Sequence, residues 1–310
     1  MSNLYKRRHF IKCCTALSLA AARQAWGANT SPSGLSATEL ATNIYLIHGA
    51  GSNVIARIGS KEVLLVDGGL AEHSQALLAL VTGLSNGLPI STLFNTHWHW
   101  NHTGSNEAIK QQGAEIIAHE NTRLWLGAEI ISQTEQRIYP PRSEQALPTL
   151  TFFYGHKSLR FEHESIEYGY LAQAHTDGDI YVRFPDSNIL VVGDTLSVAR
   201  YPTLDYSTGG WIGGLISATR TLLALCDEKT KVIPGTGSVQ SKADLQAQLD
   251  MCEAIRESIA NNYRQAIDYD EWLASQPSQA FDQHWGSPQK FLEQAYKGAN
   301  GHIRELGGIF

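Results

Sequence analysis

The sequence predicts an α+β protein in which two β-sheets lie between layers of helices. Short apolar runs with strand character are followed by helical spacing, and this succession occurs twice along the 310 residues. The chain is 43% hydrophobic and 17% charged, so it can bury a large core. It shows no repeat, low-complexity tract or linker after its N-terminal region. Residues 35–310 are therefore predicted to form a single domain.

The first succession begins with three short strands, expected at Asn43–Ile47, Asn53–Ile58 and Glu62–Val66. The spacing of leucines predicts an amphipathic helix from His73 to Thr82, and a strand follows at Ile90–Phe94. Smaller elements come next: a helix at Glu107–Gln112, a strand at Glu115–Ala118 and a helix at Glu120–Leu126. His119 lies before that last helix, and we expect it to start the helix rather than bind a metal.

The polar stretch Gly127–Leu147 contains Tyr139-Pro140-Pro141, which is typical of a surface loop or lid. The second succession has strands in Thr151–Leu171 and at Ile180–Phe184, Ile189–Val192 and Lys231–Pro234. Pro185-Asp186-Ser187-Asn188 indicates a hairpin turn. An apolar-faced helix is expected at Gly213–Cys226. Ser241, with Asp244 three residues later, indicates the capped start of a long helix.

Residues 1–28 have the pattern of an export signal. Paired Arg7 and Arg8 precede Phe10-Ile11-Lys12 and the uncharged run Cys13–Ala22. The pair resembles a twin-arginine signal, which predicts passage through the twin-arginine translocase and a periplasmic or otherwise exported bacterial protein. The apolar run is much shorter than the ~20 residues that span a membrane, so no anchor is expected after the leader is removed.

Removing the leader takes away five basic residues and no acidic ones, which changes the formal net charge from −6 to −11. A chain this acidic is a poor partner for nucleic acid or anionic lipid, so we expect a small-molecule substrate. Cys226 and Cys252 remain after removal. In an oxidising compartment they can form a disulfide, or they can be separate buried helix cysteines.

Three histidines lie within six residues directly after the predicted strand Ile90–Phe94. His97 and His99 are two residues apart, so both rings leave the same side of an extended strand end and can bind one ion. His102 follows across a turn and can reach the same ion or a neighbouring one. Neutral imidazole is the commonest zinc ligand, so this stretch predicts a metal site.

The run His97-Trp98-His99-Trp100-Asn101-His102 resembles the His-x-His-x-Asp-His signature of the metallo-β-lactamase superfamily. Later motifs follow in the family's order: Ala174-His175-Thr176-Asp177-Gly178-Asp179, then Gly193-Asp194-Thr195, then Pro234-Gly235-Thr236-Gly237. The resemblance spans nearly all of the mature chain. It implies a four-layer αββα sandwich, with two mixed sheets face to face between outer helices.

The resemblance also implies a first metal site of His97, His99 and His175 with an open fourth position, which is typical of catalytic zinc. The second site keeps His102 and Asp194. It lacks two family ligands, because Asn101 stands where the family has Asp and Thr236 where most relatives have His. We therefore expect one firmly bound Zn²⁺ and a second site, with Asn101, that is weak or empty.

This donor set predicts a zinc-dependent hydrolase that uses metal-bound hydroxide on an ester, thioester, amide or lactone. Asp194 can accept the water's proton or become a fourth ligand. His102 can protonate a leaving group or hydrogen-bond Asp194. Two alternatives stay open. One is a mononuclear iron (sulfur) dioxygenase with iron on His97, His175 and Asp194. The other is a non-catalytic metal-binding or scaffold protein.

Four tryptophans lie near these motifs and have two interpretations. They can line an apolar substrate cleft, but each alone is expected to pack in the core, because aromatic side chains dominate buried area. They are Trp98, Trp100, Trp125 and Trp211.

Overall fold

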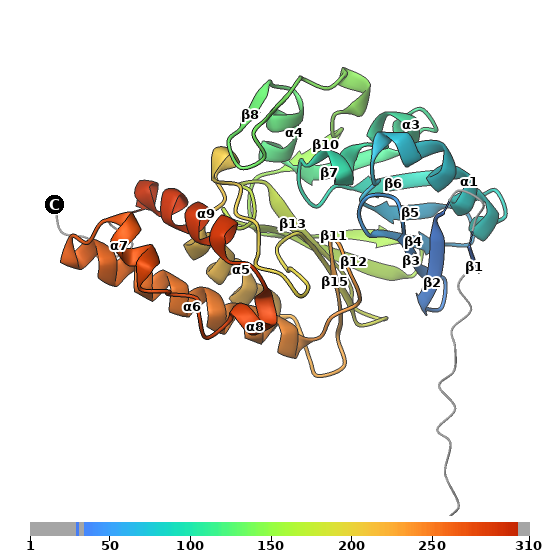
Figure 1. The fold of residues 1–310 in the computed structure, drawn as a ribbon. Coiled ribbons are helices and arrows are strands. Elements are labelled where there is room, and N and C mark those ends of the chain that lie inside the picture. The colour runs from blue at the N-terminus through green and yellow to red at the C-terminus, as the bar shows by residue number, and fades with distance from the viewer. Residues whose placement is uncertain (1–28, 31–33, 303–310) are drawn as a thin grey trace, which may run out of the picture.

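A computed structural model describes residues 29–30 and 34–302, so the predicted export signal at 1–28 lies outside the described residues. Two sheets face each other, and helices cover their outer faces (Figure 1). This arrangement confirms the predicted αββα sandwich. In the part of the chain that the structure describes, no helix has the length and apolar character needed to cross a membrane.

The first sheet has eight strands in the order β1-β2-β3-β4-β5-β6-β7-β10. Their bounds are β1 Asn29–Thr30, β2 Ser36–Ala41, β3 Ile44–His48, β4 Val54–Ile58, β5 Val63–Val66, β6 Ile90–Phe94, β7 Glu115–His119 and β10 Leu150–Phe152. Pairing is antiparallel from β1 to β5 and parallel from β5 through β6 and β7 to β10. The sheet is therefore mixed.

The second sheet has five strands in the order β11-β12-β13-β14-β15. Their bounds are β11 His156–Phe161, β12 Glu164–Leu171, β13 Asp179–Phe184, β14 Ile189–Gly193 and β15 Lys231–Pro234. All neighbours are antiparallel except β14 and β15, which run parallel. The predicted turn joins β13 to β14, with Asn188 at a φ of 52°.

Helices pack on the outer face of each sheet. Four helices follow strands of the first sheet along the chain: α1 Ser74–Ser85, α2 Trp100–Thr103, α3 Asn106–Lys110 and α4 Glu120–Leu126. The second sheet is covered by α5 Ile212–Ala224, α6 Lys242–Gln265, α7 Tyr269–Ala274, α8 Asp282–Trp285 and α9 Gln289–Ala299. Ser241 and Asp244 form the predicted capping box of α6. Helices α7, α8 and α9 were not predicted.

Alternation along the strands separates the core into layers. In β5, Leu64 and Val66 point between the sheets, while Val63 and Leu65 contact the outer helices. In β14, Val191 points between the sheets, and the residues beside it face α5 and α6. Because strand side chains alternate with a period of two, these all-apolar strands bury both faces. They hold the loops at their ends in fixed positions.

The segment Gly127–Leu147, predicted as a surface loop or lid, is largely exposed but contains strands that were not predicted. The segment contains an antiparallel pair, β8 Ile130–Ser132 and β9 Arg137–Tyr139. Ile130 and Tyr139 face inward and pack with Trp98 and Leu126, whereas the neighbouring residues of the hairpin are polar or exposed. That burial, which depends on contacts distant in sequence, stabilises the hairpin.

Several smaller predictions can be compared with the structure. His119 starts α4, and its ring accepts a hydrogen bond from the Asn121 amide at 3.2 Å, as expected. Cys226 and Cys252 are both free, and Cys226 lies beyond the end of α5 rather than within it. Among the four tryptophans, Trp98 and Trp211 are buried, and Trp100 and Trp125 are partly exposed.

Candidate metal centre

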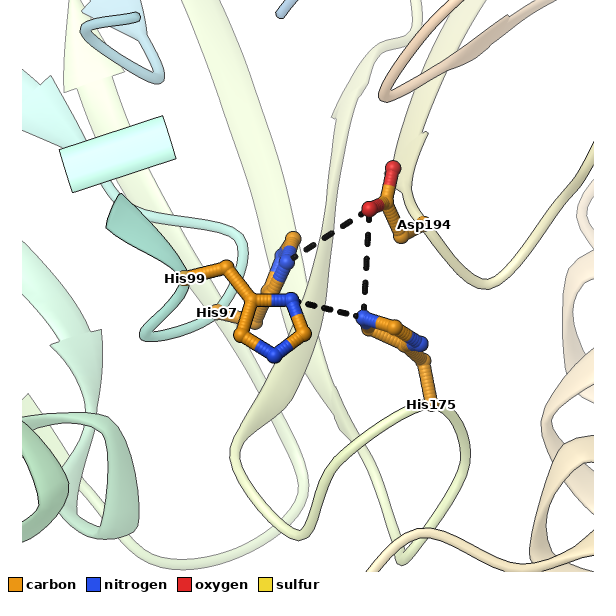
Figure 2. A group of neighbouring side chains, drawn as sticks. All are labelled: His97, His99, His175 and Asp194. Carbon is orange, nitrogen blue, oxygen red and sulfur yellow. Dashed lines mark hydrogen bonds and ion pairs between the residues drawn. The ribbon is translucent and has the colours of Figure 1, made fainter. Parts of the chain in front are cut away.

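The candidate site lies where strands of both sheets end. His97 and His99 follow β6 of the first sheet, and His175 and Asp194 follow β12 and β14 of the second. Four ligand atoms, one from each of these side chains, lie within 4.8 Å of one another (Figure 2). The structure thus brings together residues separated by up to 97 positions in the sequence. A group of three histidines and one carboxylate can hold a metal ion.

The atoms that face one another are specific. Nδ1 of His99 lies 3.0 Å from Nε2 of His175. Oδ2 of Asp194 lies 3.8 Å from Nε2 of His97 and 3.8 Å from Nε2 of His175. The Asp194 carboxylate, which comes from the second sheet, therefore faces the three rings (Figure 2).

Each of the three rings is held by its outer nitrogen. Nδ1 of His175 lies 2.8 Å from the Thr203 carbonyl oxygen, and Nε2 of His99 lies 3.3 Å from Oδ2 of Asp205. A carbonyl and a carboxylate only accept, so both outer nitrogens must be the protonated ones. The inner nitrogens, Nε2 of His175 and Nδ1 of His99, consequently present lone pairs to each other.

The outer nitrogen of the His97 ring also faces an acceptor, which is the hydroxyl of Thr96. Its Nδ1 lies 3.1 Å from Oγ1 of Thr96, which donates its own proton to Oδ2 of Asp67 at 2.8 Å. The hydroxyl must then accept from Nδ1, which leaves a lone pair on Nε2. That Nε2 atom is buried and has no hydrogen-bond partner among the described residues.

Three lone pairs that converge without a donor between them fit a cation. Two acceptor nitrogens 3.0 Å apart repel unless a proton or a metal ion lies between them. Burial, followed by the neighbouring His102, His99 and His175, holds the pKa of His97 well below its usual range, so that its ring is neutral. Neutral imidazole is the form that binds metals, and the donor set therefore fits the predicted ion.

His102 lies beside this cluster but is not among its four members. Its Nδ1 is 2.8 Å from Oδ2 of Asp67, and its Nε2 is 3.5 Å from Oδ1 of Asp194. Burial alone would lower the pKa of His102, but the two flanking carboxylates raise it to about 10. Burial acts to raise the pKa of Asp194, and His102 opposes it and holds that pKa well below its usual range.

Asp67 is a site residue that the sequence analysis did not select. It follows β5, has a φ of 61°, and accepts from the amide and hydroxyl of Thr96 at 2.8 Å each, besides its contact with His102. One carboxylate thus positions both the His97 ring and the His102 ring. An acid directly after a buried strand was a usable signal, the same one that identified Asp194.

Asp205 is the second site residue that the sequence analysis did not select. Its carboxylate is fully buried and holds the His99 ring, and it also accepts from Oγ1 of Thr208 at 2.7 Å and of Thr134 at 3.1 Å. Burial acts to raise its pKa, but the bonds to His99 and Thr208 lower it below the usual value. Asp205 lies in an irregular loop, so no local pattern in the sequence pointed to it.

The structure also shows where the two residues that depart from the family signature lie. Asn101 lies on α2, partly exposed. The hydroxyl of Thr236 accepts a hydrogen bond from Nη2 of Arg200 at 2.6 Å. A side chain at Gly235 would meet Oδ1 of Asp194 at 2.0 Å, so only glycine leaves room for that carboxylate.

Fold and site together define an αββα protein with a histidine and aspartate cluster able to hold a metal ion. Residues 37–271 match the family model of the Metallo-beta-lactamase superfamily. The chain belongs to this superfamily.

Solved structures agree with this assignment. A metallo-beta-lactamase from Pontibacter korlensis has a TM-score of 0.57 and 19% identity, covering 71% of this chain and 99% of that one. The DIM-1 metallo-beta-lactamase has a TM-score of 0.56 and 21% identity, covering 71% and 97%. At these identities the likeness concerns the fold.

A curated relative also matches. The alpha subunit of 2,4-dinitroanisole O-demethylase from Nocardioides sp. (strain JS1661) is 25% identical over 187 residues. The match covers 59% of this chain and 52% of the relative, so the chain spans about half of that protein's length.

Proposed function

We propose that this protein is an exported hydrolase that uses one zinc ion, held by His97, His99 and His175, on a small ester, thioester, amide or lactone. The observation that carries the proposal is the hydrogen-bond acceptor that lies against the outer nitrogen of each ring. All three outer nitrogens are engaged as donors, so three inner lone pairs meet at one point. When bound there, zinc lowers the pKa of a coordinated water towards ~7 and supplies a nucleophile at neutral pH.

The position of Asp194 supports a role in accepting a proton from the attacking water. Its Oδ2 faces the cluster, whereas its Oδ1 faces Nε2 of His102. The His102 side chain is 0% exposed, which argues against direct proton donation to a leaving group. With Asp67 on its other nitrogen, His102 is held between two carboxylates and orients Asp194. We assign His102 a positioning role and Asp194 the role of general base.

Two features of the second site support a single tightly held ion. Asn101 offers a neutral amide in place of a carboxylate. The hydroxyl of Thr236 is already engaged by the Arg200 guanidinium, which places a permanent positive charge beside the position of the missing imidazole. A cation at this place disfavours a second divalent ion by direct repulsion.

The donor set also bears on the iron alternative. A mononuclear iron oxygenase is typically built on two histidines and one carboxylate. Here a third imidazole, His99, is anchored by the buried carboxylate of Asp205 and belongs to the same cluster. Three anchored histidines are the ligand set of a catalytic zinc centre, and we therefore favour zinc over iron.

The test combines metal analysis with a substrate panel. Protein purified from its native host is expected to contain about one zinc per chain, and zinc-loaded protein is expected to hydrolyse at least one ester, thioester, amide or lactone. Because the curated relative is named for acting on 2,4-dinitroanisole, an aryl methyl ether belongs in the panel. His97→Ala, His99→Ala and His175→Ala should each lose most metal and most activity, because each removes one of three strong donors.

The matched control is His163→Ala, at an exposed position in the turn between β11 and β12. It should retain metal and activity. Stoichiometric iron with oxygen uptake would favour the dioxygenase. Bound zinc without turnover of any substrate would favour the non-catalytic alternative. Full metal retention in all three histidine variants would refute the site itself.

A further inference from the structure

The segment Thr203-Leu204-Asp205 supports two of the three ligand histidines at once. The Thr203 carbonyl oxygen lies 2.8 Å from Nδ1 of His175, and Oδ2 of Asp205 lies 3.3 Å from Nε2 of His99. The Asp205 amide also donates to the His175 carbonyl oxygen at 2.9 Å. Both rings therefore take their directions from three consecutive residues of an irregular loop.

The middle residue of this segment is held by helix α9. The Leu204 amide donates to Oε1 of Gln294 at 3.0 Å, and the two residues are buried, with exposed fractions of 0% and 3%. The Leu204 side chain belongs to the same core cluster as Phe291 and Leu292 of α9. A buried amide without an acceptor costs free energy, so the bond to Gln294 fixes the orientation of the Leu204 peptide group.

Tyr201, two residues before the segment, is also attached to the helices that follow α7. Its amide donates to the Trp285 carbonyl oxygen at 3.1 Å, and its hydroxyl donates to Oδ1 of Asp282 at 2.8 Å. Its ring stacks on Phe291, with ring centroids 5.0 Å apart. Asp282 and Trp285 belong to α8, and Phe291 belongs to α9. Both helices therefore hold the loop 201–205.

Helix α9 also approaches the residues after the segment. A Cβ atom built at Gly298 would lie 3.4 Å from Cβ of Tyr206 and 3.5 Å from the Gly210 carbonyl oxygen. The helix thus stays close to this loop for about one turn, from Gln294 to Gly298. Helices α8 and α9 lie beyond residues 37–271, the part of the chain matched to the family. The support of the two rings therefore includes a region outside that match.

We propose that Gln294 is a positioning residue of the metal centre, and that α8 and α9 fix the loop 201–205 so that the rings of His99 and His175 converge. The proposal rests on the three-histidine site proposed above. Gln294 acts through the Leu204 peptide group and not as a ligand. Loss of a group that holds a ligating histidine typically weakens metal binding about 10–100-fold, and because Gln294 acts one residue further away we expect about tenfold.

Two substitutions at position 294 and one matched control test this role in the full chain. Gln294→Met has a similar length but offers the Leu204 amide no oxygen acceptor. Gln294→Glu keeps an oxygen acceptor, and the atom that it replaces, Nε2, has no hydrogen-bond partner among the described residues. The control is Asn262→Leu on α6. Asn262 is 3% exposed and donates to the hydroxyl of Tyr296 on α9 at 3.1 Å, a buried bond that does not involve the loop 201–205.

The first measurement is zinc affinity, by competition between metal-free protein and a chromogenic chelator. Gln294→Met should bind zinc about tenfold more weakly than wild type, whereas Gln294→Glu and Asn262→Leu should stay within about twofold. Urea unfolding of the metal-free proteins checks that Gln294→Met and Asn262→Leu are folded and lose stability to a similar extent.

The second measurement is the visible absorption of cobalt(II)-loaded protein, which depends on the arrangement of the ligands around the ion. Gln294→Met should change this spectrum, because the rings of His99 and His175 lose their fixed directions. Asn262→Leu should keep the wild-type spectrum. A loss of stability alone leaves the spectrum of the folded protein unchanged, so this measurement separates positioning from folding.

A milder variant tests the proposal if Gln294→Met does not fold. Tyr201→Phe removes the hydrogen bond to Asp282 and keeps the ring that stacks on Phe291. It should weaken zinc binding at least about threefold and alter the cobalt spectrum. Wild-type affinity and spectrum in this variant would refute the support of the metal centre by α8 and α9.

The outcomes separate this inference from the hydrolase proposal. If wild type binds zinc but cleaves no substrate, and Gln294→Met weakens binding, the hydrolase function fails and the role of Gln294 stands. If Gln294→Met keeps the wild-type affinity and spectrum, the role of Gln294 is refuted, whatever the activity. Equal losses of affinity in Gln294→Met and Asn262→Leu would show a general loosening of α9 and refute it too. A wild type that binds neither zinc nor cobalt would overturn both proposals.

Discussion

Nδ1 of His102 and Oδ2 of Asp67 lie 2.8 Å apart, with side chains that are 0% and 2% exposed. The same carboxylate accepts two hydrogen bonds from Thr96, which in turn holds His97. A pair removed from water in this way is stable only while both members are present, because a single buried charge lacks compensation. Asp67 therefore connects the integrity of the fold to the geometry of the metal centre.

Asp67→Asn should consequently destabilise the protein by roughly 3 kcal/mol, since the amide puts a donor against the protonated His102 ring or the Thr96 hydroxyl. Urea unfolding of the metal-free protein measures this loss. Asp186→Asn, in the exposed turn between β13 and β14, is the matched control and should stay within ~0.5 kcal/mol of wild type. Equal stability of Asp67→Asn and wild type would show that the pair is not ionic.

Asp205→Asn should weaken metal binding about 10–100-fold while the three ligand histidines remain. The amide can present its nitrogen to Nε2 of His99, and the ring then loses the acceptor that fixes its tautomer. Competition with a chromogenic chelator measures the affinity. Thr134→Val removes one outer hydrogen bond of Asp205 and should have a smaller effect. Asp250→Asn, on the exposed face of α6, should have none. An unchanged affinity in Asp205→Asn would contradict the role of the buried carboxylate.

Asn101→Asp combined with Thr236→His should raise the zinc retained after dialysis from about one per chain to about two. The double variant returns a carboxylate and an imidazole beside His102 and Asp194, which gives four donors of types that zinc accepts. The new imidazole also displaces Arg200 from position 236. Single variants should fall between. Ser238→His, on the same loop at an exposed position, controls for an added histidine and should leave the count at one. Two ions held tightly by wild type would refute the mononuclear centre.

Arg7→Lys combined with Arg8→Lys should leave the precursor in the cytoplasm if residues 1–28 direct twin-arginine export. The translocase recognises the arginine pair, so a change that keeps the charge should still block transport. Cell fractionation and immunoblotting measure the result. Lys6→Arg combined with Lys12→Arg changes flanking basic residues and should preserve export. An unchanged periplasmic yield for the first variant would argue against this route.

His97 and His99 were selected from their spacing after the strand Ile90–Phe94, and His175 and Asp194 from motifs that resemble those of the family. The apolar runs Ile90–Phe94 and Ile189–Val192 were recognised as strands, so the residues just after them could be placed at strand ends. The placement of His97, His99, His175 and Asp194 agrees with that reading, while their role as ligands stays a prediction. Asp67 carried the same signal and was overlooked. His102, by contrast, is not a member of the cluster and lies between Asp67 and Asp194.

The remainder depended on contacts that local patterns do not encode. Asp205 meets His99 across 106 positions from an irregular loop. The hairpin of β8 and β9 exists because Ile130 and Tyr139 are buried against Trp98. Helix α9 was missed although its buried Phe291, Leu292 and Ala295 have helical spacing, which was a readable signal.

The four members of the cluster divide equally between the two sheets: two follow β6, and two follow β12 and β14. A bound ion would therefore act as a cross-link between the halves of the sandwich. By mass action, free metal at 1,000 times its dissociation constant would add about 4 kcal/mol to the stability of the folded chain. Chelation would withdraw that contribution from both halves at once. Resistance of this protein to heat and proteolysis would then follow the supply of metal.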